Sequence, residues 1–142
     1  MSPELFEAVR VLARAAVPVS VAIHDTDASH VAGDAAKYPF LVLSGGVTRD
    51  YGDGVGWCRD ESTALVRVTH TALSAGAVRS LLRMTRSVLV DAAPIVEGWH
   101  AFGLSIEDSQ GVEVDRDVKV VNGNTAQNPF YAVDIYRVQA TR

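Results

Sequence analysis

The sequence predicts an α+β fold in which two α-helices pack on one face of a mixed or antiparallel β-sheet. Apolar residues recur at helical spacing near the N-terminus and again over residues 74–91. Most of the remaining chain alternates apolar and polar residues in short stretches bounded by glycine, proline, asparagine and aspartate. The resulting order, α-β-β-β-α-β-β-β, is typical of a two-layer domain. At 142 residues, the chain is expected to form a single domain, 1–142.

The first helix begins at Ser2 and Pro3, an N-cap residue followed by a residue that suits the first helical position. The apolar positions that follow at helical spacing are Leu5, Phe6, Val9, Leu12, Ala13 and Ala16. Pro18 ends this helix, because proline cannot donate a backbone hydrogen bond. Two strands are then expected at 19–25 and 38–46, separated by a polar loop.

Residues 47–61 contain three glycines at alternate positions and are expected to form a mobile loop or a twisted hairpin tip. A strand follows at 62–70, and Ser74 can cap a long helix that runs to about residue 91 and is closed by Pro94. The buried stripe expected for this helix is Val78, Leu81, Leu82, Thr85, Val88 and Leu89.

Three further segments complete the predicted sheet. Residues 98–108 and 112–121 are expected as strands, or as one strand and a bent segment. Residues 122–128 form a turn-rich break. The last strand occupies 128–142 and runs almost to the end of the sequence.

This last strand is apolar on both faces, whereas a strand of a small domain usually keeps one face in water. One face carries Tyr131, Val133 and Ile135. The other carries Phe130, Ala132, Tyr136 and Val138, interrupted by Asp134. Either another segment of the same chain covers the second face, with 98–108 as the candidate, or a neighbouring chain does.

Composition excludes several classes of protein. A net charge of −4 and a pI near 5.5 argue against a general nucleic-acid-binding protein. The single cysteine, Cys58, excludes an internal disulfide and fits a reducing compartment. Charges within the first 14 residues argue against a signal peptide, and no apolar run is long enough to cross a bilayer. The protein is therefore expected in the cytosol or in a particle assembled there.

Candidate catalytic and metal-binding residues are few. His24, Asp25, Asp27 and His30 lie within seven residues and are of metal-ligand type, but their spacing matches no closed zinc site and a polar loop explains them equally well. His70 and His100 have no visible acid or nucleophile partner, and no nucleophile signature surrounds Cys58. We expect no catalytic site, no metal and no cofactor.

Three arginines form the one charge pattern with a defined geometry. Arg79, Arg83 and Arg86 are spaced i, i+4 and i+7, which places them on one face of the second helix. The face could be ordinary solvated surface, or a surface for a polyanion or an acidic partner subunit.

Four stretches, in this order and spacing, resemble a known family. After the N-terminal helix come the strand entry "YPFLVL" (38–43), the strand and long helix of 64–90, the Gly-Trp segment and Asp-containing strand of 98–120, and the Pro-aromatic final strand "NPFYAVDIYRVQATR" (128–142). The chain resembles the tail terminator, or tail completion, protein of long-tailed phages, in the form carried by phages of actinobacteria.

The resemblance implies a structural virion protein that forms a closed ring, typically a hexamer, on the finished tail tube at the head–tail junction. Such a ring ends tail polymerisation and offers the surface to which the head-side connector docks, while DNA passes through its bore. Its partners are other copies of itself, the tail tube protein and the connector, without membrane, cofactor or chemistry. The alternatives are another neck or tail ring protein, such as the head-completion stopper, a monomeric binding module, or a small cytosolic α+β enzyme using Cys58 or a histidine–carboxylate pair.

The ring interpretation assigns tentative contact residues. Phe130 and Tyr136 are expected to contact a neighbouring chain, or an element outside their own sheet layer, because they lie on the second apolar face of the last strand. Tyr51 and Trp57 belong to the glycine-rich segment 47–61, which is expected to become ordered against a neighbour. Arg79, Arg83 and Arg86 are expected to line the bore or the subunit boundary.

Overall fold

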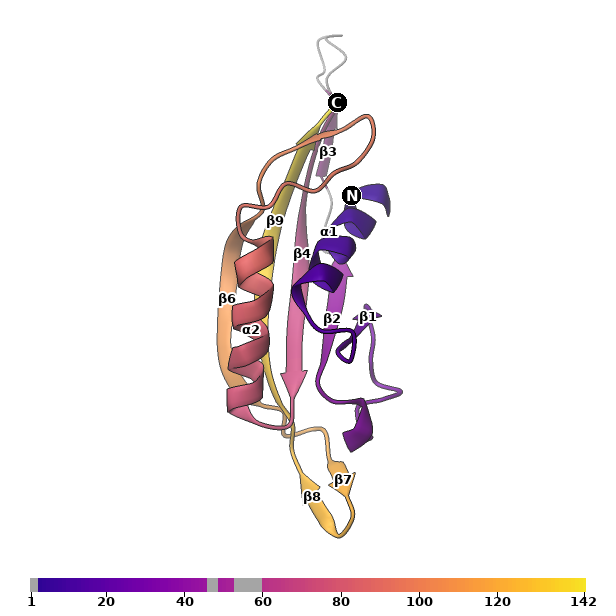
Figure 1. Ribbon diagram of the computed structural model, residues 1–142. Helices are drawn as coiled ribbons and strands as arrows, with labels where there is room; N and C mark the ends of the chain where they lie inside the picture. The colour runs from indigo at the N-terminus through magenta and orange to yellow at the C-terminus, as the bar shows by residue number, and fades with distance from the viewer. Residues whose placement is uncertain (1–2, 46–48, 53–59) are drawn as a thin grey trace.

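A single curled sheet with two helices on one face organises the computed structural model, which describes residues 3–45, 49–52 and 60–142 (Figure 1). The predicted fold class is therefore confirmed. The elements in chain order are α1 (Pro3–Ala16), β1 (Ala22–Asp25), the 3-10 helix η1 (Ala35–Lys37), β2 (Phe40–Gly45), β3 (Arg49–Gly52), β4 (Asp60–Ala72), α2 (Ala75–Leu89), β5 (His100–Ala101), β6 (Ser105–Val114), β7 (Val120–Asn122), β8 (Thr125–Gln127) and β9 (Phe130–Thr141). No helix in these ranges is long and apolar enough to span a membrane.

The two long strands β4 and β9 form the centre of the sheet. They pair antiparallel from Glu61 opposite Thr141 to Ala72 opposite Phe130. On the far side of β4, β3 pairs with its N-terminal part and β2 with its C-terminal part, and β1 adds to β2 in parallel. On the other side, β5 and β6 pair with β9. The sheet is mixed because only the β1–β2 pair is parallel.

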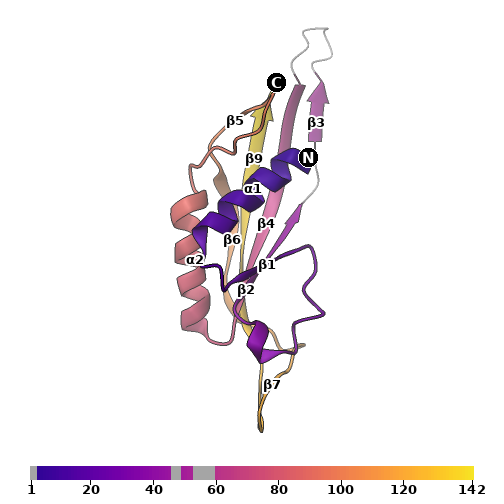
Figure 2. The same ribbon diagram turned by 45° about the vertical axis from the view of Figure 1, so that its right-hand side comes forward.

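Both helices cover the same face of this sheet, as Figure 2 shows from a second direction. Val66 and Tyr136 are directly opposite each other on β4 and β9 and belong to the core beneath the helices. The residues that the helices bury against them are Leu5, Val9 and Ala13 of α1 and Val78, Leu81, Thr85 and Leu89 of α2. Each fully buried Val or Leu side chain contributes about 1.5–3 kcal/mol to folding.

Helix α2 begins as predicted but ends earlier than expected. The Ser74 side chain accepts a hydrogen bond from the Ala77 backbone N–H at 3.1 Å, which makes it the N-cap. The helix ends at Leu89 rather than about residue 91, and Asp91 adopts a left-handed φ of 67°. The Asp91 N–H bonds to the Leu104 carbonyl, and a Cβ on Gly103 would lie 2.9 Å from the Asp91 carbonyl oxygen. A close return of the chain, and not Pro94, therefore ends the helix.

The region expected as strand 112–121 is divided into two parts. β6 ends at Val114, and β7 pairs with β8 to form a separate two-stranded hairpin that projects beyond the main sheet (Figure 1). Gly123, at a φ of 64°, supplies the turn of this hairpin. The expected break at 122–128 is therefore the hairpin turn together with β8. Residues 49–52 pair with β4, which matches the hairpin alternative for 47–61, whereas 46–48 and 53–59 lie outside the described residues.

A buried ion pair joins α2 to β9. Asp134 has no exposed surface, and its carboxylate accepts hydrogen bonds from Nε and a terminal nitrogen of Arg86, each at 2.8 Å. The Ser109 hydroxyl of β6 donates to the same carboxylate at 2.7 Å. Burial raises the pKa of Asp134, but the bonds from Arg86 and Ser109 outweigh it and hold the pKa below its usual value. Asp134, the acidic residue within β9, is thus neutralised by a residue of its own chain.

A second polar residue, His70, lies fully buried between the sheet and α2. Its Nδ1 is 3.2 Å from the Ala132 carbonyl oxygen, and its Nε2 is 2.7 Å from the Thr85 hydroxyl. Because a carbonyl only accepts, Nδ1 carries the proton of the neutral ring, and Nε2 then accepts from the Thr85 hydroxyl, whose single proton cannot at the same time serve the Leu82 carbonyl 3.2 Å from the same oxygen. Burial lowers the pKa of His70 to about 4, so the ring is neutral at neutral pH.

We predict that Arg86→Ala destabilises the protein more than Asp134→Asn does. The first change leaves a carboxylate buried without a cation, which costs about 3 kcal/mol even after allowance for the 41% exposure of the Arg86 side chain. The second keeps polar partners for Ser109 and costs about 1–2 kcal/mol. Urea unfolding measures both, with the exposed Arg83→Ala as a control expected to stay within about 0.5 kcal/mol of wild type. If Asp134→Asn destabilised the protein more than Arg86→Ala did, an unpaired buried carboxylate would not be the larger cost, and the prediction would be contradicted.

We also predict that stability falls as the pH is lowered from about 6.5 to about 4. In this window the unfolded chain protonates His70, whose ordinary pKa is 6.5, while the folded protein with its pKa of about 4 does not. The loss approaches roughly 3 kcal/mol at pH 4. The unfolding free energy is measured across this pH range for wild type and for His70→Leu. The lowered pKa of His24 affects both proteins equally, so the difference between them reports His70 alone. If the unfolding free energy fell equally with pH in the two proteins, the proposed role of His70 would be contradicted.

Candidate functional site

The candidate chemical residues that the structure describes do not converge into a reactive centre. The His24 ring on β1 meets the rings of His30 and Phe40 edge-on, each at a centroid distance of 5.4 Å. Asp27 accepts from the backbone and hydroxyl of Ser29, and Asp25 accepts from Thr26. Within the described ranges, no group of three or more histidine, cysteine, aspartate or glutamate residues could hold a metal ion. The carboxylates of this loop therefore stabilise local turns.

The remaining histidines are placed differently from one another. His70 and Thr85 form a histidine–hydroxyl pair, but both side chains are fully buried, so a substrate has no access to them. His100 is exposed and lies edge-on to the Phe102 ring. Cys58 falls in 53–59, outside the described residues.

The helix face of β9 belongs to the subunit's own core. Tyr136 has no exposed surface and packs beneath the helices, so no surface is left for a second chain. Tyr136 is expected from the sequence to contact a neighbouring chain or an element outside its own sheet layer, and within the subunit it contacts the helix layer, which is the second of these alternatives. Phe130 is half-buried and packs against the same core, which leaves part of its ring exposed at the end of the strand.

The opposite face of β9 carries no helix and is partly polar. The Tyr131 hydroxyl donates to Glu113 Oε2 at 3.0 Å, and Arg137 pairs with Glu107 at 2.8 Å. Val133 is nevertheless buried, and Ile135 is half-buried. The strand that appears apolar on both faces therefore has one face in the core and one mixed face outside it.

The predicted arginine face divides into two parts. Arg79 and Arg83 are exposed, and neither has an ion pair with any described residue. Arg86 turns towards the sheet and is bound to Asp134, so it differs from the other two arginines, and the expectation that the three line the bore or the subunit boundary stays a prediction. Tyr51 lies on β3, opposite Glu61, and its side chain is outside the described part of the structure, as is all of Trp57.

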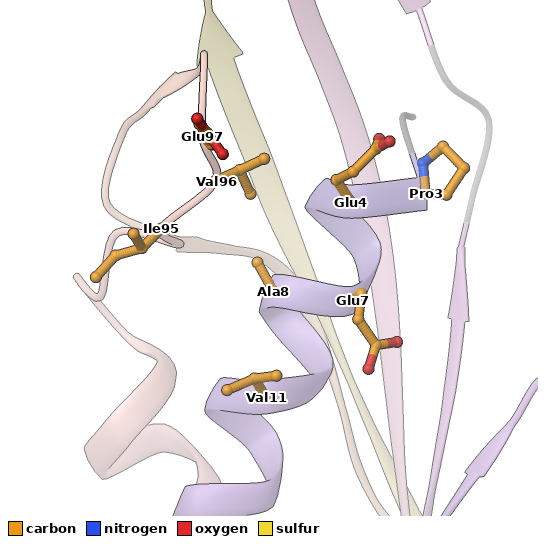
Figure 3. Close-up of a pocket in the computed structure, with 8 residues that line it drawn as sticks. All are labelled: Pro3, Glu4, Glu7, Ala8, Val11, Ile95, Val96 and Glu97. Carbon is orange, nitrogen blue, oxygen red and sulfur yellow. The ribbon is translucent and has the colours of Figure 1, made fainter.

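An open groove of about 500 Å³ lies between α1 and the segment that follows α2 (Figure 3). It is lined by Pro3, Glu4, Glu7, Ala8, Val11, Ile95, Val96 and Glu97. Ala8 and Val96 point towards each other from the two walls, and Glu4 and Glu97 stand on opposite walls (Figure 3). Ile95 is 95% exposed and Val11 is 60% exposed. We refer to these eight residues as the α1 groove.

Sequence reasoning missed the α1 groove, although two signals for it are present. Val11 is apolar but lies outside the buried stripe of the first helix, and Ile95 and Val96 are an apolar pair in a segment assigned to no element. Neither signal indicates by itself that the two segments meet, because they are more than 80 residues apart in the sequence.

The comparisons with known proteins show a fold but no family. No protein-family model matches the chain, and no curated protein matches it. Among solved structures, the chain is similar to a chain of "Virion of native gene transfer agent (GTA) particle", with a TM-score of 0.60 and 13% sequence identity. The likeness covers 97% of this chain and 92% of that chain. At this identity it shows that the two chains share a fold.

We predict that Tyr136→Phe leaves stability unchanged or raises it by up to about 1 kcal/mol. The Tyr136 hydroxyl is buried and has no hydrogen bond of good geometry to a described residue, and the Thr85 hydroxyl nearby interacts with it only weakly, so its removal loses little and relieves a poorly paired polar group. Urea unfolding measures the change, with Tyr131→Phe at the exposed Glu113 contact as the matched control. A loss above about 1 kcal/mol would show that the hydroxyl does have a partner.

Proposed function

We propose that the protein is a structural component of a phage-like virion and, within it, the tail terminator. In this role it forms a ring, expected to be hexameric, that caps the tail tube, ends tube polymerisation and offers the surface to which the head-side connector docks. The observation that carries the proposal is the fold shared with a chain of the gene transfer agent virion, because the likeness extends over nearly all of both chains. The resemblance of the sequence to tail terminators adds the more specific assignment.

The surfaces of the protein fit a subunit that works through protein contacts. The α1 groove is open, its floor is apolar, and it contains no cluster of convergent polar groups of the kind that binds a substrate. The β7–β8 hairpin projects away from the sheet, and its Val121 is 59% exposed (Figure 1). We propose that Val121 and the apolar residues of the groove contact neighbouring chains in the particle.

The ring proposal assigns roles to the exposed arginines and to Phe130. Arg79 and Arg83 face either the bore or a neighbouring subunit, while Arg86 adds little free charge because Asp134 neutralises it. DNA in transit requires weak contacts, since each neutralised phosphate adds affinity. The exposed part of Phe130 contacts a neighbouring chain, and Tyr51 and Trp57 are proposed to contact a ring or tube neighbour.

Another ring protein of the neck or tail, such as the head-completion stopper, is the second candidate. It draws on the same observation, because the virion likeness does not distinguish between positions along the particle. The two candidates differ in the neighbours of the ring: a terminator contacts the tail tube protein directly, whereas a stopper contacts the connector above it.

We predict that a density map of particles assembled with this chain places it as a ring on the last layer of the tail tube. Particles assembled without it should have tails of uncontrolled length and full heads that lack tails, because nothing caps the tube or joins it to the head. Supplying the intact chain in trans is the control and should restore joined particles. Density in the capsid or in the tube wall would contradict the terminator assignment, and absence from the particle would contradict the virion role.

A further inference from the structure

We propose that the α1 groove of one subunit receives the exposed arginine face of α2 from a second copy of the same chain. This rests on the proposed ring, because a ring of identical subunits needs two different surfaces that match each other. The argument uses the groove, its charge, and the position of the arginines.

Two apolar side chains of the α1 groove lie largely in contact with water. Ile95 is 95% exposed beside the half-buried Val96, and Val11 is 60% exposed on the facing helix. The walls stand apart and leave about 500 Å³ between them, enough to accept side chains from a partner. An apolar floor with a charged rim is typical of a protein contact site.

The charge of the glutamates that line the groove limits which kind of partner surface can bind there. Glu4, Glu7 and Glu97 surround the groove, and of these Glu7 alone has a cation among the described residues, Arg10 at 3.6 Å. Both side chains of that pair are largely exposed, so the pair contributes little to stability. The rim is therefore negative and repels DNA and acidic proteins, and it fits a basic surface that carries some apolar area.

Such a surface is present on the same chain. Arg79 and Arg83 are one helical turn apart on α2, so their guanidinium groups project side by side. Met84, the next residue, is 37% exposed but lies about 100° further round the helix, so it can contribute an apolar contact only at the edge of this face. Arginine binds carboxylates with two parallel hydrogen bonds, which suits the glutamates on the rim.

The two surfaces lie on different parts of the molecule. In Figures 1 and 2, α2 lies on one side of the helix layer and the N-terminal end of α1 lies at the other. Five of the eight groove residues belong to α1. Contact between copies is therefore head-to-tail, with the groove of one against α2 of the next. Contacts of this kind close into a ring when the rotation between subunits allows it.

A charge-swap experiment tests the pairing. The groove variant Glu4→Arg/Glu97→Arg and the helix variant Arg79→Glu/Arg83→Glu should each self-associate at least about tenfold more weakly than wild type, as measured by sedimentation velocity over a wide concentration range. An equimolar mixture of the two should recover association, because each offers an intact surface to the other. A chain carrying all four changes should also recover it, and added salt should weaken every one of these assemblies.

A matched pair of apolar changes controls for folding. Ile95 and Val19 are 95% and 93% exposed, so a neutral asparagine at either position should leave the subunit folded by circular dichroism. Ile95→Asn should weaken self-association, because it removes the apolar contact without adding charge, whereas Val19→Asn, outside the groove, should not. If the changes at Ile95 and Val19 weakened self-association equally, the groove would not be the docking site. This conclusion holds even if a charge variant fails to fold.

The outcomes separate this inference from the proposed function. If wild type forms rings and neither charge variant affects them, or if the mixture does not recover association, the pairing is wrong and the virion role is unaffected. If wild type shows no self-association free or on tail tubes, the second copy is excluded as the occupant, and the particle map still decides the virion role. If the charge swap succeeds but the chain is absent from particles, the pairing stands and the proposed function fails.

Discussion

The antiparallel pairing of β4 with β9 is the constraint on which the other features of the fold depend. Their register runs without interruption from Glu61–Thr141 to Ala72–Phe130, and every other strand of the main sheet except β1 pairs with one of these two. Because successive side chains point to opposite faces, a slip of one residue would move Tyr136 out of the core and an exposed arginine, Arg137, into it. The register thus determines which side of the sheet the helices cover.

The same register places two polar residues beneath α2, and these specify how the helix lies. Asp134 requires a cation, and His70 requires a hydrogen-bonding partner, because unpaired polar groups are costly to bury. Arg86 and Thr85, adjacent on α2, meet these requirements together. Once they face the sheet, Arg79 and Arg83 remain on the exposed part of the helix. The buried network therefore determines which arginines are free to meet a partner.

The return of the chain after α2 connects this packing to the α1 groove. The left-handed Asp91 and the close approach of Gly103 bring residues 92–104 back over the end of the helix layer, where Val96 points towards α1 and Ile95 stays exposed at the edge of the groove. An acidic rim on the groove and two arginines on α2 that have no ion pair with a described residue give one acidic chain two patches of opposite charge. This separation accounts for a chain of net charge −4 that carries a basic helix face.

The sequence by itself determined the two helices, the Ser74 cap, most of the strands and the two-layer class, because these follow from residue spacing and cap chemistry within a few turns of chain. The sequence did not determine which side of β9 is buried by its own helices, because the positions of Phe130 and Tyr136 fit a protein core and an intersubunit interface equally well. Only the tertiary structure separated Arg86 from Arg79 and Arg83, ended α2 at Leu89 and brought Val11 and Ile95 together. Each of these depends on contacts between segments far apart in the sequence, whose geometry is set by the packing of the whole sheet and helix layer and is not encoded in local spacing.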